Sequence, residues 1–490
     1  MEKQAMPAKL TAIHNQALAI LATVGINLHH VDVCEMVRRH GATIRDKTAY
    51  FPPDLVMDQV RRAPEAFTLH ARNSRYDMRI GGDQVHCAPG YGCAAICDTE
   101  GRRRMASMAD YVRFAKMVHQ SPHFKINGGI LAQPADMPPG QSHLLMLYAA
   151  MLCSDKCLLG IPAGGIQMQT IMEMGKIVFG GSKAFAARPH ILTLISTLSP
   201  LQIDETALGA MLVAARHNQP LIISPSPATG TTGPIDMAAN ISLATAEALA
   251  AIAIVQMVNP GTPVIFGLQC LGADLRTGNI SMGSPAYTLQ SKYTAALARM
   301  YGLPCRCGGA LTDALHPGVQ SGYESMLNLV AAYVNGVNLV VHSAGTLDSV
   351  AALSYDKFIA DLEIIDMVRY YLQELVVDHE TLNLALIRSV GPGGQFLNTI
   401  DTLRKCRSHT WDPPIGVRGY IRGQSAAQAY ATRIADRQRQ MLTDYAASPP
   451  AMDRARLEQL NALLHEQGID AALLDSIRRL AATVQADEIT

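Results

Sequence analysis

The sequence predicts an α/β protein built on a (β/α)8 (TIM) barrel, with an N-terminal helical and β-hairpin extension and a C-terminal helical appendage. Short apolar runs alternate with helix-like stretches from about residue 120 onward, a rhythm typical of a parallel sheet. About eight such units follow one another, which favours a closed barrel, with a doubly wound open sheet as the alternative. Hydrophobic residues make up 49% of the 490 positions and charged residues 17%, so a large buried core is expected.

The N-terminal extension is predicted over residues 1–120. Its segments "LTAIHNQALAILATVGI" and "VDVCEMVRRHGA" carry apolar residues three and four positions apart and end at Gly25 and Gly41, as amphipathic helices do. The stretch "YDMRIGGDQVHCAPGYGCAAICDTEGRRRMAS" alternates in polarity and contains Gly-Gly and Glu-Gly turns. A small β-hairpin element is therefore expected before the barrel begins.

The barrel is predicted over residues 121–400. Its expected strands are "FKINGGILA" (124–132), "KCLLGIPAG" (156–164), "HILTLIST" (190–197), "PLIISPSP" (220–227), "PVIFGLQC" (263–270), "PCRCGGA" (304–310), "NLVVHSAG" (338–345) and "LALIRSVG" (384–391). Several of these runs end in clusters of Gly, Ser, Thr and Pro. Because the carboxyl ends of barrel strands face the active site, these small residues predict a wide opening there.

Residues 401–490 are predicted to form the helical appendage. The segments "QSAAQAYATRIADRQRQMLTDYA" and "MDRARLEQLNALLHEQ" are amphipathic, with "ASPP" between them. Such helices pack on the barrel or on a second subunit, so a homo-oligomer is expected.

The composition excludes several classes of partner. Lys+Arg and Asp+Glu balance at 41 each, so no basic field points to nucleic acid or to an anionic membrane. The N-terminus has no apolar core of a secretory signal, and the apolar stretch from Ile241 to Val258 contains Glu247 and reads as a buried helix. The 10 cysteines match no structural zinc spacing, so reduced thiols in a cytoplasmic protein without a tightly bound metal are expected.

Several long stretches resemble the trimethylamine methyltransferase family, in the branch that lacks pyrrolysine. They are "PLQIDETAL", "PLIISPSPATGTTGPIDMA", "QMVNPGTPVIFG", "GADLRTGNISMGSPAY", "TDALHPGVQSGYES" and "SAGTLDSVAALSYDKFIADLEIID". The resemblance implies a (β/α)8 barrel that transfers a methyl group from an amine to the Co(I) of a corrinoid. No Asp-x-His-x-x-Gly motif of a cobalamin-binding domain occurs in the chain, so a separate corrinoid-binding protein is the expected partner.

The resemblance also indicates the type of amine. Leu347 and Asp348 match the Leu-Glu pair that precedes pyrrolysine in trimethylamine enzymes, so Ser349 stands at the pyrrolysine position. A quaternary ammonium leaves as a neutral tertiary amine and needs no general acid, which is why a serine is acceptable there. The expected substrate is glycine betaine or a relative such as proline betaine, carnitine or γ-butyrobetaine. The catalytic candidates are Ser349, Asp348 and Glu324.

A quaternary amine with a carboxylate requires aromatic faces for its cation and hydrogen-bond donors for its anion. The substrate-binding candidates near the expected strand ends are Tyr91, His316, Gln320, Tyr323, His342, Tyr355, Phe358, Gln395 and Phe396. The resemblance implies a His near the "GPGG" motif where this chain has Gln395, a departure that points to a different substrate. For each aromatic side chain, packing beside a strand end is the competing interpretation.

Two loops are candidates for contact with the corrinoid or its protein. The loop "SPSPATGTTGP" could bind an anion through its backbone N–H groups, although it is not a P-loop. The following loop carries an Arg that could reach a corrinoid amide or a substrate carboxylate, or form a surface salt bridge. The cofactor-binding candidates are Ser226, Thr229, Thr231, Asp274 and Arg276.

Two other functions remain open from the sequence. Cys305 and Cys307 alternate on one expected strand and, with Cys270, could hold the zinc of a thiol methyltransferase, although buried Cys is more often a small hydrophobic residue. A barrel that binds a betaine without catalysis is the third hypothesis.

Overall fold

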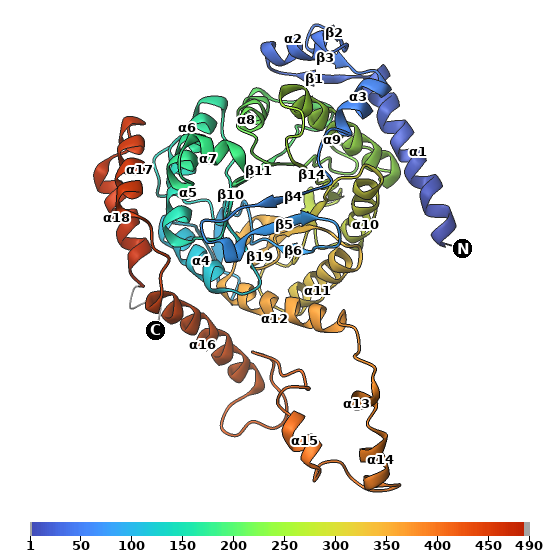
Figure 1. Cartoon of the computed structure of the whole chain (residues 1–490), viewed down its shortest axis with the longest axis vertical. Coiled ribbons are helices and arrows are strands. Elements are labelled where there is room, and N and C mark those ends of the chain that lie inside the picture. Colours follow the sequence, from blue (N-terminus) through green and yellow to red (C-terminus); the bar gives the residue numbers. More distant parts are fainter. Residues whose placement is uncertain (1, 485–490) are drawn as a thin grey trace.

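The computed structural model describes residues 2–484 and has an α/β architecture, with parallel strands at the centre and helices around them (Figure 1). One parallel sheet has five strands in the order β14-β13-β11-β10-β9, and another has three strands in the order β17-β18-β6. Their bounds are β6 His86–Cys87, β9 Ile126–Gly128, β10 Cys157–Leu159, β11 Ile191–Ile195, β13 Leu221–Ile223, β14 Val264–Phe266, β17 Arg306–Gly308 and β18 Leu339–Val341. All but the last of the runs predicted as barrel strands therefore contain a strand.

Each edge of the five-stranded sheet lies beside one edge of the three-stranded sheet. An isolated parallel bridge pairs Cys87 with Phe124, just before β9, and another pairs Phe266 of β14 with Cys305, just before β17. No continuous ladder joins the two sheets, so the structure shows parallel α/β sheets and the predicted barrel closure rests on these single bridges.

A long helix follows each parallel strand. These helices are α4 Met108–Gln120, α5 Ser142–Cys153, α6 Gly165–Val178, α8 Glu205–Arg216, α9 Met237–Val258, α10 Pro285–Met300, α11 Val319–Val334 and α12 Tyr355–Tyr371. Side-chain caps fix several of their starts, among them Ser107, Asp204, Ser284 and Ser354. Within residues 2–484, α9 is the one helix long and apolar enough to cross a membrane, and 94% of its most apolar stretch is buried inside the protein.

The N-terminal extension contains more strands than the sequence predicts. Its elements are α1 Glu2–Thr23, β1 Ile26–Leu28, α2 Val31–Arg39, β2 Thr43–Arg45, β3 Thr48–Tyr50, α3 Pro53–Val60, β4 Ala66–Leu69, the 3-10 helix Ser74–Tyr76 and β5 Met78–Gly81. The predicted boundary at residue 120 separates β6 from the other parallel strands, since β6 pairs with β18.

The β4–β5 hairpin covers the amino ends of the parallel strands. His70 N donates to the carbonyl of Pro189 before β11 at 2.8 Å, and Asn73 N donates to that of Asp155 before β10 at 3.1 Å. Phe67 and Met78 of the hairpin join the apolar cluster formed by inward-facing residues such as Leu192. This end of the structure is therefore filled, which leaves the carboxyl ends of the strands for a site.

Small strands and a short helix decorate the carboxyl side. They are β7 Ala95–Cys97, β8 Arg103–Met105, β15 Gly272–Asp274, β16 Asn279–Ser281, β19 Thr346–Leu347, the 3-10 helix η2 Asp348–Val350 and β20 Ala352–Leu353. The remaining short elements are α7 Ser182–Ala187 and β12 Gln202–Ile203, which pairs with β1.

The prediction of a strand at residues 384–391 is wrong. This segment is the helix α14 Leu384–Val390, which starts at Asn383, whose side chain accepts a hydrogen bond from Leu386 N at 3.2 Å, and ends at Gly391 with φ 68°. The run has a cap at each end, so helical hydrogen bonding satisfies its backbone locally. The chain leaves the parallel strands after α12, ahead of the predicted barrel limit at residue 400.

Residues 373–424 form an arm that projects away from the body (Figure 1). It contains α13 His379–Leu382, α14 and α15 Ile400–Lys405. The chain then returns in α16 Ala426–Ala447, α17 Arg454–Glu466 and α18 Ala471–Ala482, which pack on α4, α6 and α5. The predicted appendage therefore packs on the parent chain.

Candidate functional site

The carboxyl ends of the parallel strands enclose a buried polar side chain, Arg306. Its neighbours Cys305 and Cys307 face outward, with Cys307 Sγ directed at the carbonyl of Ser291 in α10, so Arg306 points inward. Its Nη1 donates to Oε1 of Gln269 at 2.7 Å and to Oγ of Ser224 at 3.1 Å. The side chain is 1% exposed and its Nε has no partner. Among the residues that the structure describes, no carboxylate forms an ion pair with this guanidinium.

Tyr91 and His342 contact each other and lie close enough to Arg306 for its charge to act on both side chains. The backbone N–H of Tyr91 donates to Nδ1 of His342 at 3.2 Å, and the two rings make an edge contact with centroids 6.5 Å apart. Burial, and then the charge of Arg306, holds the pKa of His342 well below its usual range, so the imidazole is neutral. Because Nδ1 accepts a hydrogen bond, the proton of the neutral ring resides on Nε2.

Backbone geometry places both side chains. His342, directly after β18, has φ 60°, a left-handed conformation that is strained for a residue with a Cβ and is often found at functional sites. A Cβ on Gly129 would lie 2.7 Å from the ring of Tyr91, so a glycine is required for that ring to lie against the end of β9. The hydroxyl of Tyr91 is buried and has no partner.

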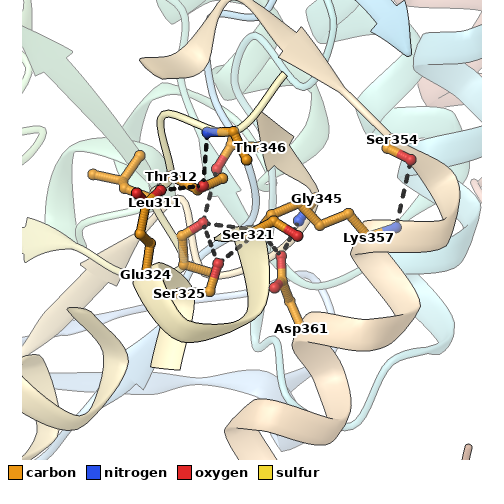
Figure 2. Close-up of polar contacts among 12 residues, drawn as sticks. Leu311, Thr312, Ser321, Glu324, Ser325, Gly345, Thr346, Ser354, Lys357 and Asp361 are labelled. Carbon is orange, nitrogen blue, oxygen red and sulfur yellow. Dashed lines mark hydrogen bonds and ion pairs between the residues drawn. The ribbon is translucent and has the colours of Figure 1, made fainter. Parts of the chain in front are cut away.

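A buried ion pair supports the loops that follow β17 and β18 (Figure 2). Lys357 Nζ lies 2.6 Å from Oδ2 of Asp361, and the two side chains are 2% and 1% exposed. The same ammonium donates to Oγ of Ser325 at 2.9 Å and to the carbonyl of Ala310 at 3.0 Å. Asp361 also accepts from Gly345 N at 2.8 Å. The pair therefore holds the loops after β17 and β18 to α11 and α12.

Glu324 takes part in the same region through hydrogen bonds. Its Oε2 accepts from Thr312 Oγ1 at 2.5 Å and from Asp313 N at 2.8 Å, while its Oε1 accepts from Gln320 Nε2 at 3.0 Å. The carboxylate is half-buried and orders the loop after β17, so the geometry gives it a positioning role.

Ser349 lies where three loops meet. Its Oγ is within donating distance of Oδ1 of Asp313, at 2.6 Å, and of the carbonyl of Ile280, at 2.7 Å. Met282 N approaches the same Oγ at 3.3 Å. The adjacent Asp348 forms an ion pair with Arg103 at 2.5 Å. Both candidates are thus tied to neighbouring loops.

The other aromatic candidates occupy different places. Tyr355 stacks on Phe114 of α4 with centroids 4.3 Å apart and donates to Oδ1 of Asp110 at 2.7 Å. Phe358 packs edge-on against Phe114 between the same two helices. These two rings fill the layer between α12 and α4, outside the parallel strands.

The remaining substrate-binding candidates are exposed. Tyr323, 61% exposed, and Gln320 lie on α11, and His316 precedes that helix with Nδ1 2.8 Å from the carbonyl of Pro317. Gln395 and Phe396 lie on the arm, between α14 and α15. Of the aromatic and histidine candidates, Tyr91 and His342 are the two that the structure brings to Arg306.

The candidate corrinoid-contact residues lie at the rim of the carboxyl side. Thr229 Oγ1 accepts from Ala273 N at 3.2 Å, and Thr231 Oγ1 donates to the carbonyl of Ala228 at 3.2 Å. Asp274 accepts from the backbone N–H of Arg276 at 3.0 Å. Ser226 Oγ donates to the carbonyl of Ser224, the residue that contacts Arg306, at 3.3 Å. These side chains build the two rim loops and join them.

The zinc alternative has no ligand set in the part of the chain that is described. Cys305 and Cys307 face the helices, and burial raises the pKa of the Cys305 thiol to about 11 and that of Cys307 further. Burial also raises the pKa of the Cys270 thiol. Across residues 2–484, no group of three His, Cys, Asp or Glu side chains lies close enough to hold a metal ion.

Some residues of this site were not identified from the sequence. They are Arg306, Gln269, Tyr287, Asp313, Lys357 and Asp361. For Arg306 a signal was present, since a charged residue between two apolar positions of a buried strand requires a partner inside the protein.

A parallel α/β scaffold with buried, partly unpaired polar side chains at the carboxyl ends of its strands is typical of enzymes that act on small molecules. The family model for trimethylamine methyltransferase (MTTB) matches residues 3–468, and the chain belongs to this family.

Two curated relatives and one solved structure are similar to the chain. The glycine betaine methyltransferase of Desulfitobacterium hafniense is 38% identical over 93% of this chain and 95% of its own length. The proline betaine:corrinoid methyltransferase of Eubacterium limosum is 28% identical over 81% of this chain and 84% of its own. The monomethylamine methyltransferase of Methanosarcina barkeri is 9% identical, covers 96% of this chain and 85% of its own, and gives a TM-score of 0.49.

Proposed function

We propose that this protein is a methyltransferase that moves a methyl group from a quaternary amine, glycine betaine or a similar betaine, to the corrinoid of a separate protein. The observation that carries this proposal is the similarity to the glycine betaine enzyme over nearly the whole of both chains. The enclosed arginine and its neighbouring hydrogen-bond donors support a substrate that has an anionic end.

The parallel strands are proposed to form a closed (β/α)8 barrel. The bridges between Cys87 and Phe124 and between Phe266 and Cys305 lie where the two sheets must meet for closure. In this arrangement β6, the first parallel strand in the chain, completes the set of eight by pairing with β18. The site then lies at the end of the barrel where active sites usually lie.

The protein's own residues position the substrate and exclude water. A quaternary ammonium departs as a neutral amine, so no side chain needs to deliver a proton to the nitrogen. The hydrogen-bonded Ser349, at the position that pyrrolysine holds in the trimethylamine enzymes by resemblance, suits this requirement. The corrinoid, when the partner presents it, supplies the nucleophilic Co(I).

The rim of the carboxyl side suits a partner that presents a large, flat and partly apolar group. Ile235, Leu275 and Ile280 are exposed there, beside the polar rim candidates Ser226, Thr229, Thr231, Asp274 and Arg276. A Cβ at Gly230 would meet Leu275 and Ile235 within 3.1 Å, so these apolar side chains share one surface. We assign this surface to the corrinoid protein.

The protein is further proposed to be cytoplasmic. All 10 cysteines are free thiols, in keeping with a reducing compartment.

The protein is also proposed to be a homo-oligomer. The arm exposes a row of large apolar side chains, including Leu375, Val376 and Val377. A cavity of about 760 Å³ lies between α11, α12 and α16, and Ala427, just after the arm, is among its lining residues. Its apolar lining, which includes Met326, Ile364 and Ile434, makes it the proposed seat for the arm of a second copy.

A reconstituted assay tests the proposed reaction. Purified protein is mixed with a reduced corrinoid-binding protein and glycine betaine, and the corrinoid absorbance and the formation of dimethylglycine are followed together. The proposal predicts stoichiometric formation of dimethylglycine. Binding of betaine without demethylation would instead support a non-catalytic betaine-binding protein. Methyl transfer to a thiol in a zinc-loaded protein would support a zinc-dependent thiol methyltransferase.

A further inference from the structure

The environment of Arg306 is electrostatically incomplete. A buried charge is tolerated when it is paired, and an isolated one is strongly destabilising. The two hydrogen-bond partners of this guanidinium, Gln269 Oε1 and Ser224 Oγ, are neutral, and its Nε has no partner. By contrast, the other fully buried cation at this end of the strands, Lys357, lies 2.6 Å from its own carboxylate on Asp361. No described carboxylate pairs with Arg306, so its surroundings suit an anionic ligand.

Three other hydrogen-bond donors lie within range of the charge of Arg306. The hydroxyl of Tyr91 is buried with no partner, and the neutral ring of His342 carries its proton on Nε2 because Nδ1 accepts from Tyr91 N. Tyr287 Oη accepts from Gly308 N at 3.0 Å, which leaves its own proton available. The charge of Arg306 acts on all three of these side chains. The set is rich in donors and poor in acceptors, as an anion site requires.

Negative charge lies on the outer side of this set. Gln269, which accepts from Arg306, directs its Nε2 at Sδ of Met282, 3.9 Å away. Met282 N in turn donates to Oδ1 of Asp313 at 2.7 Å. Arg306 and Asp313 are thus linked through two residues, with the cation on the inner side and the carboxylate toward the rim loops. This polarity matches a zwitterion whose carboxylate enters first.

We propose that Arg306, Tyr91 and His342 form a carboxylate-binding subsite that selects a betaine over a quaternary amine without an acidic group. This inference deepens the proposed function and rests on it. The carboxylate accepts from the guanidinium fork and from the Tyr91 hydroxyl and His342 Nε2–H. The apolar layer and the β4–β5 hairpin close the inner side, so the ammonium end is directed toward the carboxyl rim, where methyl transfer takes place.

Binding measurements with two ligands test the subsite. Glycine betaine and choline share a trimethylammonium head, but choline has a hydroxyl where the betaine has a carboxylate. Calorimetry on the full-length protein is expected to show tighter binding of glycine betaine in the wild type. Arg306→Met should weaken betaine binding by about 10- to 100-fold, the usual size of a charge-assisted hydrogen bond, and change choline binding by less than about 3-fold. Arg306→Lys should retain part of the preference, and Arg216→Met, at an exposed position on α8, should retain all of it.

A second variant guards against misfolding. Tyr91→Phe removes a hydroxyl that has no partner, so the melting temperature of the ligand-free protein should not fall, whereas betaine binding should weaken several-fold. Equal losses for betaine and choline in Arg306→Met, unchanged betaine binding in that variant, or no wild-type preference for betaine would each overturn the subsite. If betaine binds in an Arg306-dependent way without methyl transfer, the subsite stands and the proposed function fails. If methyl transfer is intact in Arg306→Met with an unchanged KM, the proposed function stands and the subsite fails.

Discussion

The hydroxyl of Ser349 lies 2.6 Å from a carboxylate oxygen of Asp313, on a neighbouring loop. The same carboxylate also accepts from Ser281 Oγ at 2.6 Å and from the backbone N–H groups of Met282 and Gly283 at 2.7 and 2.8 Å. Three loops at the carboxyl end are therefore held by one acid, and Ser349 contributes one of its hydrogen bonds. The resemblance aligns Ser349 with the pyrrolysine position of the trimethylamine enzymes, and in this chain the residue there joins two loops by a hydrogen bond.

The first prediction concerns that hydroxyl. Ser349→Ala removes one hydrogen bond to a charged group and should lower the free energy of unfolding by about 1.5–3 kcal/mol. Demethylation of betaine should remain within about 5-fold of wild type, because no proton has to be delivered to the leaving amine. Thermal unfolding and turnover are measured on the same preparation.

Ser349→Gly serves as the matched control. Ser349 has φ 47° and ψ 44°, a left-handed conformation that glycine adopts without strain, so this variant should be more stable than Ser349→Ala. A turnover loss of 100-fold or more in a fully stable Ser349→Ala protein would make the hydroxyl a catalytic group and contradict the structural role.

The second prediction concerns the buried pair Lys357–Asp361 (Figure 2). Replacing one partner leaves an uncompensated buried charge, so Lys357→Met and Asp361→Leu should each destabilise the protein by about 3–5 kcal/mol. The double variant should recover most of this loss, a coupling that a double-mutant cycle of denaturant unfolding measures. Additive losses would show that the two side chains act independently.

The third prediction is a dependence of stability on pH. Burial, and then the charge of Lys156, lowers the pKa of His119 from 6.5 to about 4. As the pH falls, the unfolded chain therefore takes up a proton before the folded protein does. Stability from this group should be intact above pH 6.5 and should be lost between pH 6.5 and about 4.

Melting temperatures measured across this interval check the prediction. His119→Gln should flatten part of the decline, since the amide does not titrate, whereas His40→Gln, at an exposed position, should not change the slope. Parallel curves for wild type and His119→Gln would contradict the assignment.

The fourth prediction concerns the arm of residues 373–424. Leu375, Val376 and Val377 are 88%, 71% and 71% exposed, a run that needs a cover in solution. Size-exclusion chromatography with light scattering should give a multiple of the monomer mass for the wild type. The combined change of all three residues to Ser should shift it toward the monomer. A monomeric wild-type protein would contradict the proposed arm exchange.

Much of the fold could be predicted from the sequence because each parallel strand other than β6 lies in a short apolar run that precedes a helix. The exception is instructive. A short apolar run fits a strand and a buried helix equally well, and residues 384–391 became a helix because caps at Asn383 and Gly391 satisfied it locally. The strand that was not predicted, His86–Cys87, is too short to give a periodic signal, and its place is fixed by pairing with β18.

The site was predicted less completely for a physical reason. His342 was identified because it follows an apolar run and Tyr91 because it is an aromatic residue near the expected strand ends, and the charge of Arg306 acts on both in the structure. The role of Arg306 depends on what its side chain meets across the interior, at Gln269 and Ser224, which are far away in the sequence. Tyr355 and Phe358 follow a strand in the sequence as well, but their helix turns them outward onto α4.

The most direct test of the central claim compares two methyl donors under identical conditions. Single-turnover rates of methyl transfer to a reduced corrinoid-binding protein are measured for glycine betaine and for trimethylamine between pH 6 and 9. Because a quaternary amine is already activated as a methyl donor, we expect transfer from glycine betaine at a rate that varies little with pH, and no transfer from trimethylamine. Comparable rates for the two donors, or a betaine rate that requires a protonated group on the enzyme, would contradict it.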